Sequence, residues 1–392
     1  MSHPLNIPRR LLLRASALCA ALFLAACDPS QFGGGGGAID PSAPVPVALL
    51  VPGAEGTTGE IAGLSRSLEN AARMAMADLQ GVEVDLRVYG TGGTAGGASA
   101  AATRAADEGA AILLGPLFAE AANAAGNAVA GRGLNVLAFS NNTAIAGGNV
   151  FVLGNTFDNV ARRLTSYAAS QGKRNVLVVS AQTAAEGTGR DAILRAASSN
   201  RLNVVGNITF PLSEEGIRSA APQIASQARS TGADAIFFTS ENAGAMAFLP
   251  QFLQEEGLSS DVAQYVGITR LDLGDGALAA PGIQGAWFAL PDPSLSNNFR
   301  SRYATTYGSS PHPLAGLAYD GIAAVGALAS QGRADALSRS ALTQGSGFVG
   351  VGGIFRFRSD GTNERGMAVA QIQNQRSVII SAAPTRFGGA GF

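Results

Sequence analysis

The sequence contains few of the side chains on which metal sites and catalytic centres depend. Its 392 residues include only two histidines, His3 and His312, and only two cysteines, Cys19 and Cys27. A zinc site or a histidine-based catalytic triad needs several such side chains close together, and this chain cannot supply them. The composition therefore predicts a protein that is not an enzyme and that binds no metal or other cofactor.

Charge is also scarce. Only 14% of the residues are charged, the formal net charge is -1, and Lys173 is the only lysine. Because the sequence shows neither a basic stripe nor an acidic tail, we do not expect nucleic acid as a partner. Hydrophobic residues make up 46% of the chain. A body of about 345 residues follows the amino-terminal region and is long enough to form two compact lobes.

Residues 1–26 are typical of a signal peptide. Three arginines, Arg9, Arg10 and Arg14, precede an apolar stretch at residues 15–23, which is too short to span a bilayer stably. The following residues 24–27, Leu-Ala-Ala-Cys, resemble the bacterial lipobox, whose cysteine is acylated and becomes the new amino terminus. An ordinary secretory signal that happens to end in cysteine is the alternative. The paired arginines leave the general secretory and twin-arginine export routes both open.

Cys27 is thus the predicted lipidation site. Cys19 lies in the segment that would be removed, so the mature chain would keep no second thiol for an intramolecular disulfide. Residues 27–44 are rich in glycine, proline and serine, and they predict a flexible tether after the lipidated cysteine. We expect the protein to face the periplasm of a Gram-negative-type bacterium, anchored by lipid to the inner or the outer membrane.

Beyond the predicted tether, apolar strands alternate with amphipathic helices. Clear examples of strands are Val45–Val51 and residues 111–114, 176–179 and 235–239, all of which are almost wholly apolar. Strands of this kind, joined by helices, indicate parallel sheets that are covered on both faces. The end of the chain differs, because residues 353–381 predict an antiparallel hairpin. The predicted fold class is α/β, with two doubly wound parallel-sheet lobes.

Several stretches, taken in order, resemble type I periplasmic binding proteins of the leucine/isoleucine/valine-binding kind. These stretches are residues 47–52, 109–117, 138–141, 318–321 and 353–357. The resemblance spans about residues 45–385 and implies two lobes joined by a hinge that the chain crosses three times. It assigns residues 45–157 and 290–345 to lobe 1, residues 158–289 and 346–385 to lobe 2, and residues 386–392 to a tail.

The resemblance also implies a ligand cleft between the lobes. In such receptors, hydroxyls and amides at strand ends hold a ligand carboxylate, and an acidic residue of the second lobe holds the ammonium. Ser140, Asn141, Asn142 and Thr143 follow a strand of lobe 1, at the edge where ligands bind in open α/β sheets. The alternative interpretation of these four residues is a polar turn that caps the next segment.

The second lobe supplies further candidates. Glu241 and Asn242 follow one of its strands, and Glu241 is the candidate partner for an ammonium group. A solvent-exposed carboxylate at a helix start is the alternative interpretation of Glu241. Tyr319 belongs to a Tyr-Asp pair that matches the family pattern, and either ligand contact or packing would explain it.

One departure from the family pattern bears on function. Leu117, Phe118 and Ala119 stand where amino-acid receptors usually have small hydroxyl residues. Without those donors a buried ligand carboxylate would stay unpaired, which is costly. The stretches Gly-Pro-Leu and Phe-Ser-Asn on a lipoprotein look most like penicillin-binding protein activators, which implies a regulator that contacts a peptidoglycan synthase. The alternative is the lipid-anchored substrate-binding component of an ABC transporter, whose ligand would be a branched-chain or other amino acid or a similar small polar molecule.

Overall fold

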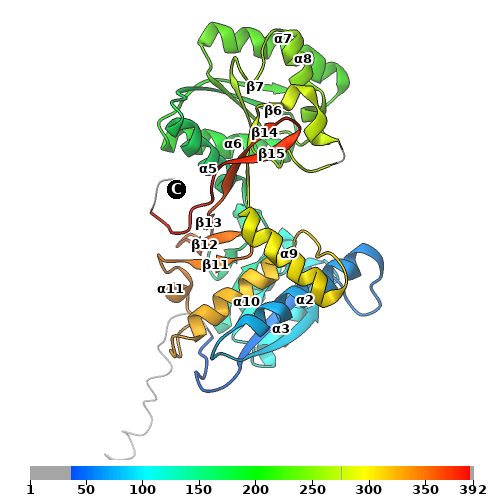
Figure 1. Cartoon of the computed structure of the whole chain (residues 1–392). Coiled ribbons are helices and arrows are strands. Elements are labelled where there is room, and N and C mark those ends of the chain that lie inside the picture. Colours follow the sequence, from blue (N-terminus) through cyan, green and yellow to red (C-terminus); the bar gives the residue numbers. More distant parts are fainter. Residues whose placement is uncertain (1–36, 275, 389–392) are drawn as a thin grey trace, which may run out of the picture. The chain divides into compact units, whose positions relative to one another are not determined.

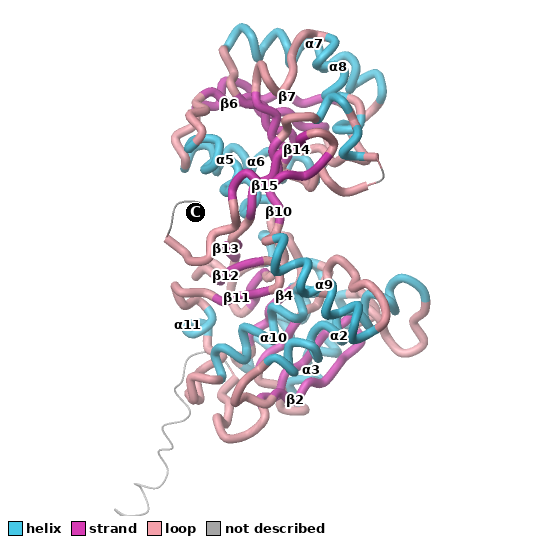
Figure 2. The backbone as a smooth tube through the Cα atoms, viewed as in Figure 1, coloured by secondary structure: helices cyan, strands magenta, loops and turns pink. Residues whose placement is uncertain are grey.

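The structure, a computed structural model, describes residues 37–274 and 276–388. The predicted signal peptide and Cys27 lie outside these residues. The described chain builds two main sheets, shown in Figures 1 and 2. The first has the order β2-β1-β3-β4-β5, and the second has the order β15-β14-β10-β9-β8-β6-β7. The predicted fold class, α/β with two parallel-sheet lobes, is confirmed.

Lobe 1 is built on the first sheet, in which every strand pair is parallel. Its strands are β1 (Val45–Val51), β2 (Val84–Gly90), β3 (Ile112–Leu114), β4 (Asn135–Ala138) and β5 (Val150–Val152). Alternate residues of β1 face opposite cores: Val47 and Leu49 pack with helices α2 (Gly59–Asp78) and α10 (Gly316–Ala329), whereas Ala48 and Leu50 pack with α3 (Ala95–Asp107) and α4 (Ala119–Val129). Both faces are therefore covered, which explains the almost wholly apolar strand sequences.

Lobe 2 is built on the second sheet in the same way. Its strands are β6 (Asn175–Ala181), β7 (Asn203–Phe210), β8 (Ala235–Phe238), β9 (Gln264–Gly267), β10 (Trp287–Leu290), β14 (Ala368–Gln373) and β15 (Arg376–Ser381). Helices α5 (Phe157–Ser170) and α6 (Ala184–Ser199) cover one face, and α7 (Glu214–Thr231) and α8 (Leu249–Glu255) cover the other. Strands β14 and β15 form an antiparallel hairpin at one side of the sheet.

A third, antiparallel sheet departs from the expected lobe boundaries. It consists of β11 (Phe348–Gly350), β12 (Gly353–Phe357) and β13 (Asn363–Arg365). The sequence assigns residues 346–385 together to lobe 2, but Phe348, Phe355 and Phe357 are buried in the core of lobe 1. Edge-to-face contacts, such as that between Phe151 and Phe357 with ring centroids 5.5 Å apart, hold this sheet there. Only β14 and β15 of the segment join the sheet of lobe 2.

The start of the described chain also differs from the sequence expectation, because Gly37 and Ile39 are packed onto lobe 1. Ile39 is only 5% exposed, and its N–H donates to the carbonyl oxygen of Ala334 at 2.9 Å. A Cβ atom on Gly37 would lie 2.5 Å from the carbonyl oxygen of Ala111, so the backbone approaches too closely for any other residue. Gly37 and Ile39 are thus anchored to the folded lobe within the stretch whose composition predicts a tether, while residues 40–44 are exposed.

The three helices that follow β10 in the described chain complete the helical cover of lobe 1. Helix α9 (Pro293–Tyr307) begins directly after that strand, with the Asp292 carboxylate accepting the Leu295 N–H at 3.0 Å. The short α11 (Arg339–Leu342) follows α10. None of the helices within residues 37–274 and 276–388 is long and apolar enough to cross a membrane.

Candidate functional site

The topology of each sheet indicates where a ligand would bind. In the first sheet β1 lies between β2 and β3, and in the second sheet β6 lies between β7 and β8. The chain therefore reverses its direction of winding beside β1 and beside β6. In open parallel sheets, such reversal points open a crevice at the carboxyl ends of the strands, and ligands bind there. The candidate site consists of the carboxyl edges of these two sheets.

The four polar residues predicted after β4 lie together in one turn. Ser140 is buried, and its Oγ accepts the Asn142 N–H at 3.1 Å. The Asn142 Oδ1 in turn accepts the Ala144 N–H at 2.9 Å and caps a short 3-10 helix, η3 (Thr143–Ile145). Asn141 is exposed and Thr143 is partly buried. These bonds are those of the polar turn that was the alternative interpretation. Asn141, which is exposed like Asn142, has no side-chain hydrogen bond within this turn.

The loop after β3 presents apolar surface at the same edge. Leu117 packs against the core of lobe 1, and Phe118 is 43% exposed. Phe118 also occupies the N-cap of α4, where its side chain makes no capping hydrogen bond. Small hydroxyl residues here would have supplied donors to a ligand. The presence of Leu117 and Phe118 therefore makes the loop after β3 apolar rather than polar.

Glu186 is the residue of lobe 2 that sequence reasoning missed. Its Oε2 accepts three hydrogen bonds: from the Ala181 N–H at 2.6 Å and from the hydroxyls of Thr239 and Ser240 at 2.8 Å each. These partners come from the carboxyl ends of β6 and β8, the two strands at the reversal point. Among the described residues, Oε1 has no hydrogen-bond partner. Glu186 is only partly exposed, so the site contains an oriented carboxylate with one oxygen free.

One sequence signal could have drawn attention to Glu186. Thr183 is the N-cap of α6 and accepts the Glu186 N–H at 3.3 Å, so the Thr-x-x-Glu spacing matches a capping box. In an ordinary capping box the glutamate bonds back to the N-cap N–H. Here the carboxylate reaches past the cap to β6 and across to β8. The pattern identifies the helix start, but the contacts with Thr239 and Ser240 depend on the fold.

Glu241 and Asn242 lie beside this carboxylate site in the chain but differ in their contacts. Glu241 is exposed, and its backbone carbonyl closes a turn by accepting the Gly244 N–H at 2.9 Å. The Asn242 Nδ2 donates to the carbonyl oxygens of Leu271 at 2.6 Å and Leu273 at 3.1 Å. Asn242 thus ties the loop after β8 to the loop after β9, whereas the Glu241 side chain is open to solvent.

Tyr319 is part of a separate polar contact in lobe 1. Its hydroxyl donates to the Asp78 Oδ2 at 2.6 Å, and Asp78 also forms an ion pair with Arg302 at 2.6 Å. Burial and the bond to Asp78 raise the pKa of Tyr319 to about 12. Asp78 is the last residue of α2, a helix that begins near the carboxyl end of β1 and runs away from it. The structure does not bring Tyr319 to the polar turn after β4.

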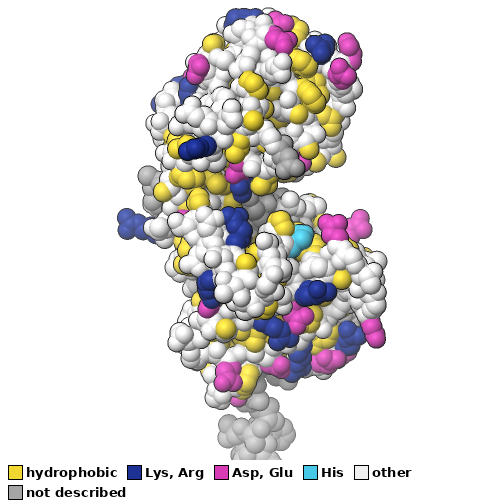
Figure 3. Space-filling model, turned by 45° about the vertical axis from the view of Figure 1, so that its right-hand side comes forward, with side chains coloured by type: hydrophobic (Ala, Val, Ile, Leu, Met, Phe, Trp, Pro, Cys, Tyr) yellow, Lys and Arg dark blue, Asp and Glu magenta, His cyan; other side chains and the backbone are white. Residues whose placement is uncertain are grey.

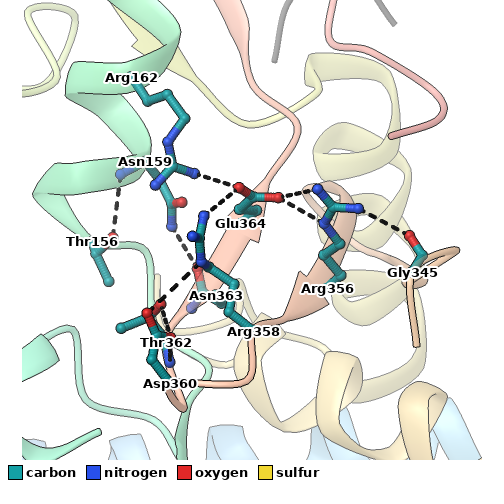
Figure 4. A network of polar contacts seen from close by, with 10 residues as sticks. All are labelled: Thr156, Asn159, Arg162, Gly345, Arg356, Arg358, Asp360, Thr362, Asn363 and Glu364. Atoms are coloured by element: carbon teal, nitrogen blue, oxygen red, sulfur yellow. Dashed lines mark hydrogen bonds and ion pairs between the residues drawn. The ribbon is translucent and has the colours of Figure 1, made fainter. Parts of the chain in front are cut away.

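A dense polar network joins the two lobes at β13 (Figure 4). The Glu364 carboxylate accepts hydrogen bonds from Arg356 of β12 at 2.6 Å and from Arg358, directly after β12, at 2.7 Å. Arg162 of α5 in lobe 2 donates to it at 3.0 Å. Beside it, the Asn159 Nδ2 donates to Asn363. Burial alone would raise the pKa of Glu364, but the Arg356 hydrogen bond and the three positive charges together hold it below its ordinary value.

A buried ion pair lies next to this network. The Arg365 guanidinium donates to the Asp320 Oδ2 at 2.9 Å and to the Leu153 carbonyl oxygen at 2.6 Å. The Asp320 Oδ1 accepts the Val351 N–H at 2.8 Å. The two residues of the Tyr-Asp pair noted in the sequence therefore make different contacts. Tyr319 links α10 to α2, and Asp320 holds β13 and the β11–β12 turn against lobe 1.

Comparison with known proteins agrees with this architecture. Residues 44–377 match the family described as "Periplasmic binding protein". A crystal structure of a putative branched-chain amino acid ABC transporter from Rhodospirillum rubrum superimposes with a TM-score of 0.71 at 19% identity, covering 86% of this chain and 100% of that one. A branched-chain amino acid ABC transporter periplasmic ligand-binding protein from Burkholderia xenovorans gives 0.66 at 18% identity, with 87% and 96% covered.

A third solved structure is a solute-binding protein of an ABC transporter from R. palustris in complex with benzoate. It superimposes with a TM-score of 0.55 at 18% identity, covering 88% of this chain and 98% of that one. At these identities the likeness concerns the fold. No curated protein sequence matched the chain.

Proposed function

Because this chain belongs to the periplasmic binding protein family, we propose that it is a lipid-anchored solute receptor that binds a small ligand carrying an ammonium group and delivers it to an ABC permease. The family binds ligands without transforming them, and its members work in the periplasm. The proposal adds the ligand chemistry, the permease and the anchor at Cys27.

The carboxylate of Glu186 is the observation that supports an ammonium ligand best. Three hydrogen bonds to Oε2 fix its direction, and they leave Oε1 as an acceptor at the reversal point of the second sheet. A charged hydrogen bond to such a preoriented carboxylate is stronger than one between neutral groups. Glu241, exposed in the neighbouring loop, is a second carboxylate that a bound cation would meet.

A thermal-shift screen of the full mature chain against amino acids and small amines tests this function. A ligand at one hundred times its Kd should stabilise the protein by about 2.7 kcal/mol. Glu186→Gln nearly keeps the size of the side chain but removes its charge, so the shift should largely disappear. Glu256→Gln, at an exposed glutamate directly after α8 in the same lobe, should leave it unchanged. A screen in which no solute shifts the transition contradicts a receptor role.

A second function, activation of a peptidoglycan synthase, is favoured by a different observation. The edge of lobe 1 exposes Phe118 where a solute receptor would place hydroxyl donors, and Ser140 already uses its Oγ within its own turn. An exposed aromatic side chain is typical of a contact with a protein partner. In this case the mature chain should raise the glycan-polymerising rate of a purified penicillin-binding protein, and Phe118→Ser should lower that stimulation. Stimulation without any solute-induced thermal shift would favour this function over the receptor.

A further inference from the structure

Four of the helices that start at the carboxyl edges carry their own anions, whereas α3, which follows β2, has no acidic residue in its first turn. The first turns of α2, α4, α6 and α7, which follow β1, β3, β6 and β7, contain Glu60, Glu120, Glu186 and Glu214 respectively. A helix amino terminus otherwise attracts a carboxylate or phosphate group through its dipole and free N–H groups. In this chain a glutamate already supplies the negative charge at each of these four helix starts. A ligand carboxylate would therefore meet repulsion at these places.

In lobe 2, the arginines near the carboxyl edge and the hydroxyls beside Glu186 are already paired. Arg190 in α6 forms an ion pair with Asp191 at 2.8 Å, and Arg270, just after β9, bonds both carboxylate oxygens of Asp272 at 2.6 and 2.7 Å. The hydroxyls of Thr239 and Ser240 donate to Glu186. Among the described residues around Glu186, the charge left over for a ligand is thus negative.

Exposed apolar side chains lie in the segments that leave the same carboxyl edges. Five exposed large hydrophobic residues lie in the segments that follow β1, β3, β7, β8 and β9: Ile61, Phe118, Leu212, Phe248 and Leu273, with exposed fractions from 38% to 57%. Figure 3 shows hydrophobic side chains in small groups among polar ones on the visible face of the molecule. Apolar groups beside unpaired carboxylates fit a ligand that is both cationic and apolar.

A buried hydroxyl near Glu186 points independently to a missing polar partner. Ser180 is fully buried, and within the described chain its Oγ makes no hydrogen bond. It precedes Ala181, whose N–H binds Glu186. Side chains alternate along β6, and Val178 packs with the core under α5 and α6, so Ser180 faces the same side as the start of α6. A buried hydroxyl without a partner costs free energy that a bound donor could recover.

From these observations we propose that the ligand is an amine with an apolar body and without a carboxylate group, rather than an α-amino acid. Glu186 would receive the ammonium group, and the apolar body would contact the exposed side chains at the strand ends. This inference rests on the proposed receptor function and specifies its ligand class. It accounts for the loss of the hydroxyl donors after β3, because a ligand without a carboxylate does not need them.

Matched pairs of compounds test the inference on the unaltered mature chain. Isothermal titration compares leucine with 3-methylbutylamine, and phenylalanine with 2-phenylethylamine, because each pair differs only in the carboxylate. We expect the amine of at least one pair to bind tenfold or more tightly than its amino acid. Glu186→Gln should weaken that binding at least tenfold, and the exposed control Glu256→Gln should not.

The outcomes distinguish the two levels of the proposal. Equal or tighter binding of the amino acid overturns the amine assignment but leaves the receptor function standing. Binding of neither compound in either pair overturns the amine assignment, and a solute screen that also gives no shift overturns the receptor function. A Glu186→Gln variant that fails to fold does not affect the test, because the paired titrations use the unaltered protein.

Discussion

The ion pair between Arg162 and Glu364 should couple the two lobes energetically. Arg162 lies on α5, whose apolar residues pack in lobe 2, whereas Glu364 lies on β13 of the small sheet whose aromatic residues pack in lobe 1. At an effective dielectric constant of about 20, charges about 3 Å apart attract by roughly 5 kcal/mol. Desolvation offsets much of this attraction, and Arg356 and Arg358 share the same carboxylate. We expect a net coupling of about 1–2 kcal/mol.

A double-mutant cycle in urea measures this coupling directly. The free energy of unfolding is compared for the unaltered chain, Arg162→Met, Glu364→Gln and the double variant. The control cycle uses Arg195 and Asp158, an ion pair at 2.8 Å that also involves α5 but whose arginine side chain is 60% exposed. That exposed pair should couple by about 0.5 kcal/mol or less. A coupling for Arg162 and Glu364 that does not exceed the control value would refute the reasoning.

Single residues give three further predictions. Ile39→Ala should lower the free energy of unfolding by about 2–4 kcal/mol in urea titrations, because the side chain is buried in lobe 1; no loss would show that Ile39 is not docked. The pKa of Glu364 is lowered in the folded state from its ordinary value of 4.5, so the ionised carboxylate stabilises the fold above that value and loses this effect as pH falls through the folded pKa. The difference in free energy of unfolding between the unaltered chain and Glu364→Gln should therefore shrink in acid. Tyr319→Phe should remove a tyrosine that ionises near pH 12, so the last step of an alkaline titration followed by ultraviolet difference spectroscopy should become smaller. If the step near pH 10 becomes smaller instead, the burial of Tyr319 is contradicted.

The strands of both main sheets could be predicted from sequence because burial on two faces leaves a clear pattern. The predicted strand Val45–Val51 coincides with β1, and the predicted strand at residues 235–239 differs from β8 by a single residue. The strands β5, β11 and β13 were not predicted. Each has only three residues, which is too few for a period to be recognised, although the equally short β3 was predicted from its apolar run at residues 111–114. The small sheet is stabilised because its phenylalanines pack into the core of lobe 1. This contact is between segments far apart in the chain, so it produces no pattern in the local sequence.

The candidate site was predicted less completely than the fold for a related reason. Position after a strand was enough to select Ser140 and Glu241, because strand ends can be read from the apolar pattern. It was not enough to tell a residue that offers its side chain from one that uses it internally, as Ser140 and Asn242 do. Glu186 owes its orientation to Thr239 and Ser240, more than fifty positions away in the chain. Such a contact exists only once β6 and β8 are neighbours.

Gly37 shows why composition alone placed the start of lobe 1 too late in the chain. Gly37 and Gly56 look alike in sequence, since each lies in a stretch of small and polar residues. Gly56 has a φ of +80° and no atom within 4 Å of the place where a Cβ would lie, so it serves a turn in open space. Gly37 is required for the opposite reason, because its backbone lies against Ala111 and leaves no room for a side chain. A glycine-rich stretch can therefore mark close packing as well as flexibility, and only the burial of a neighbour such as Ile39 distinguishes the two.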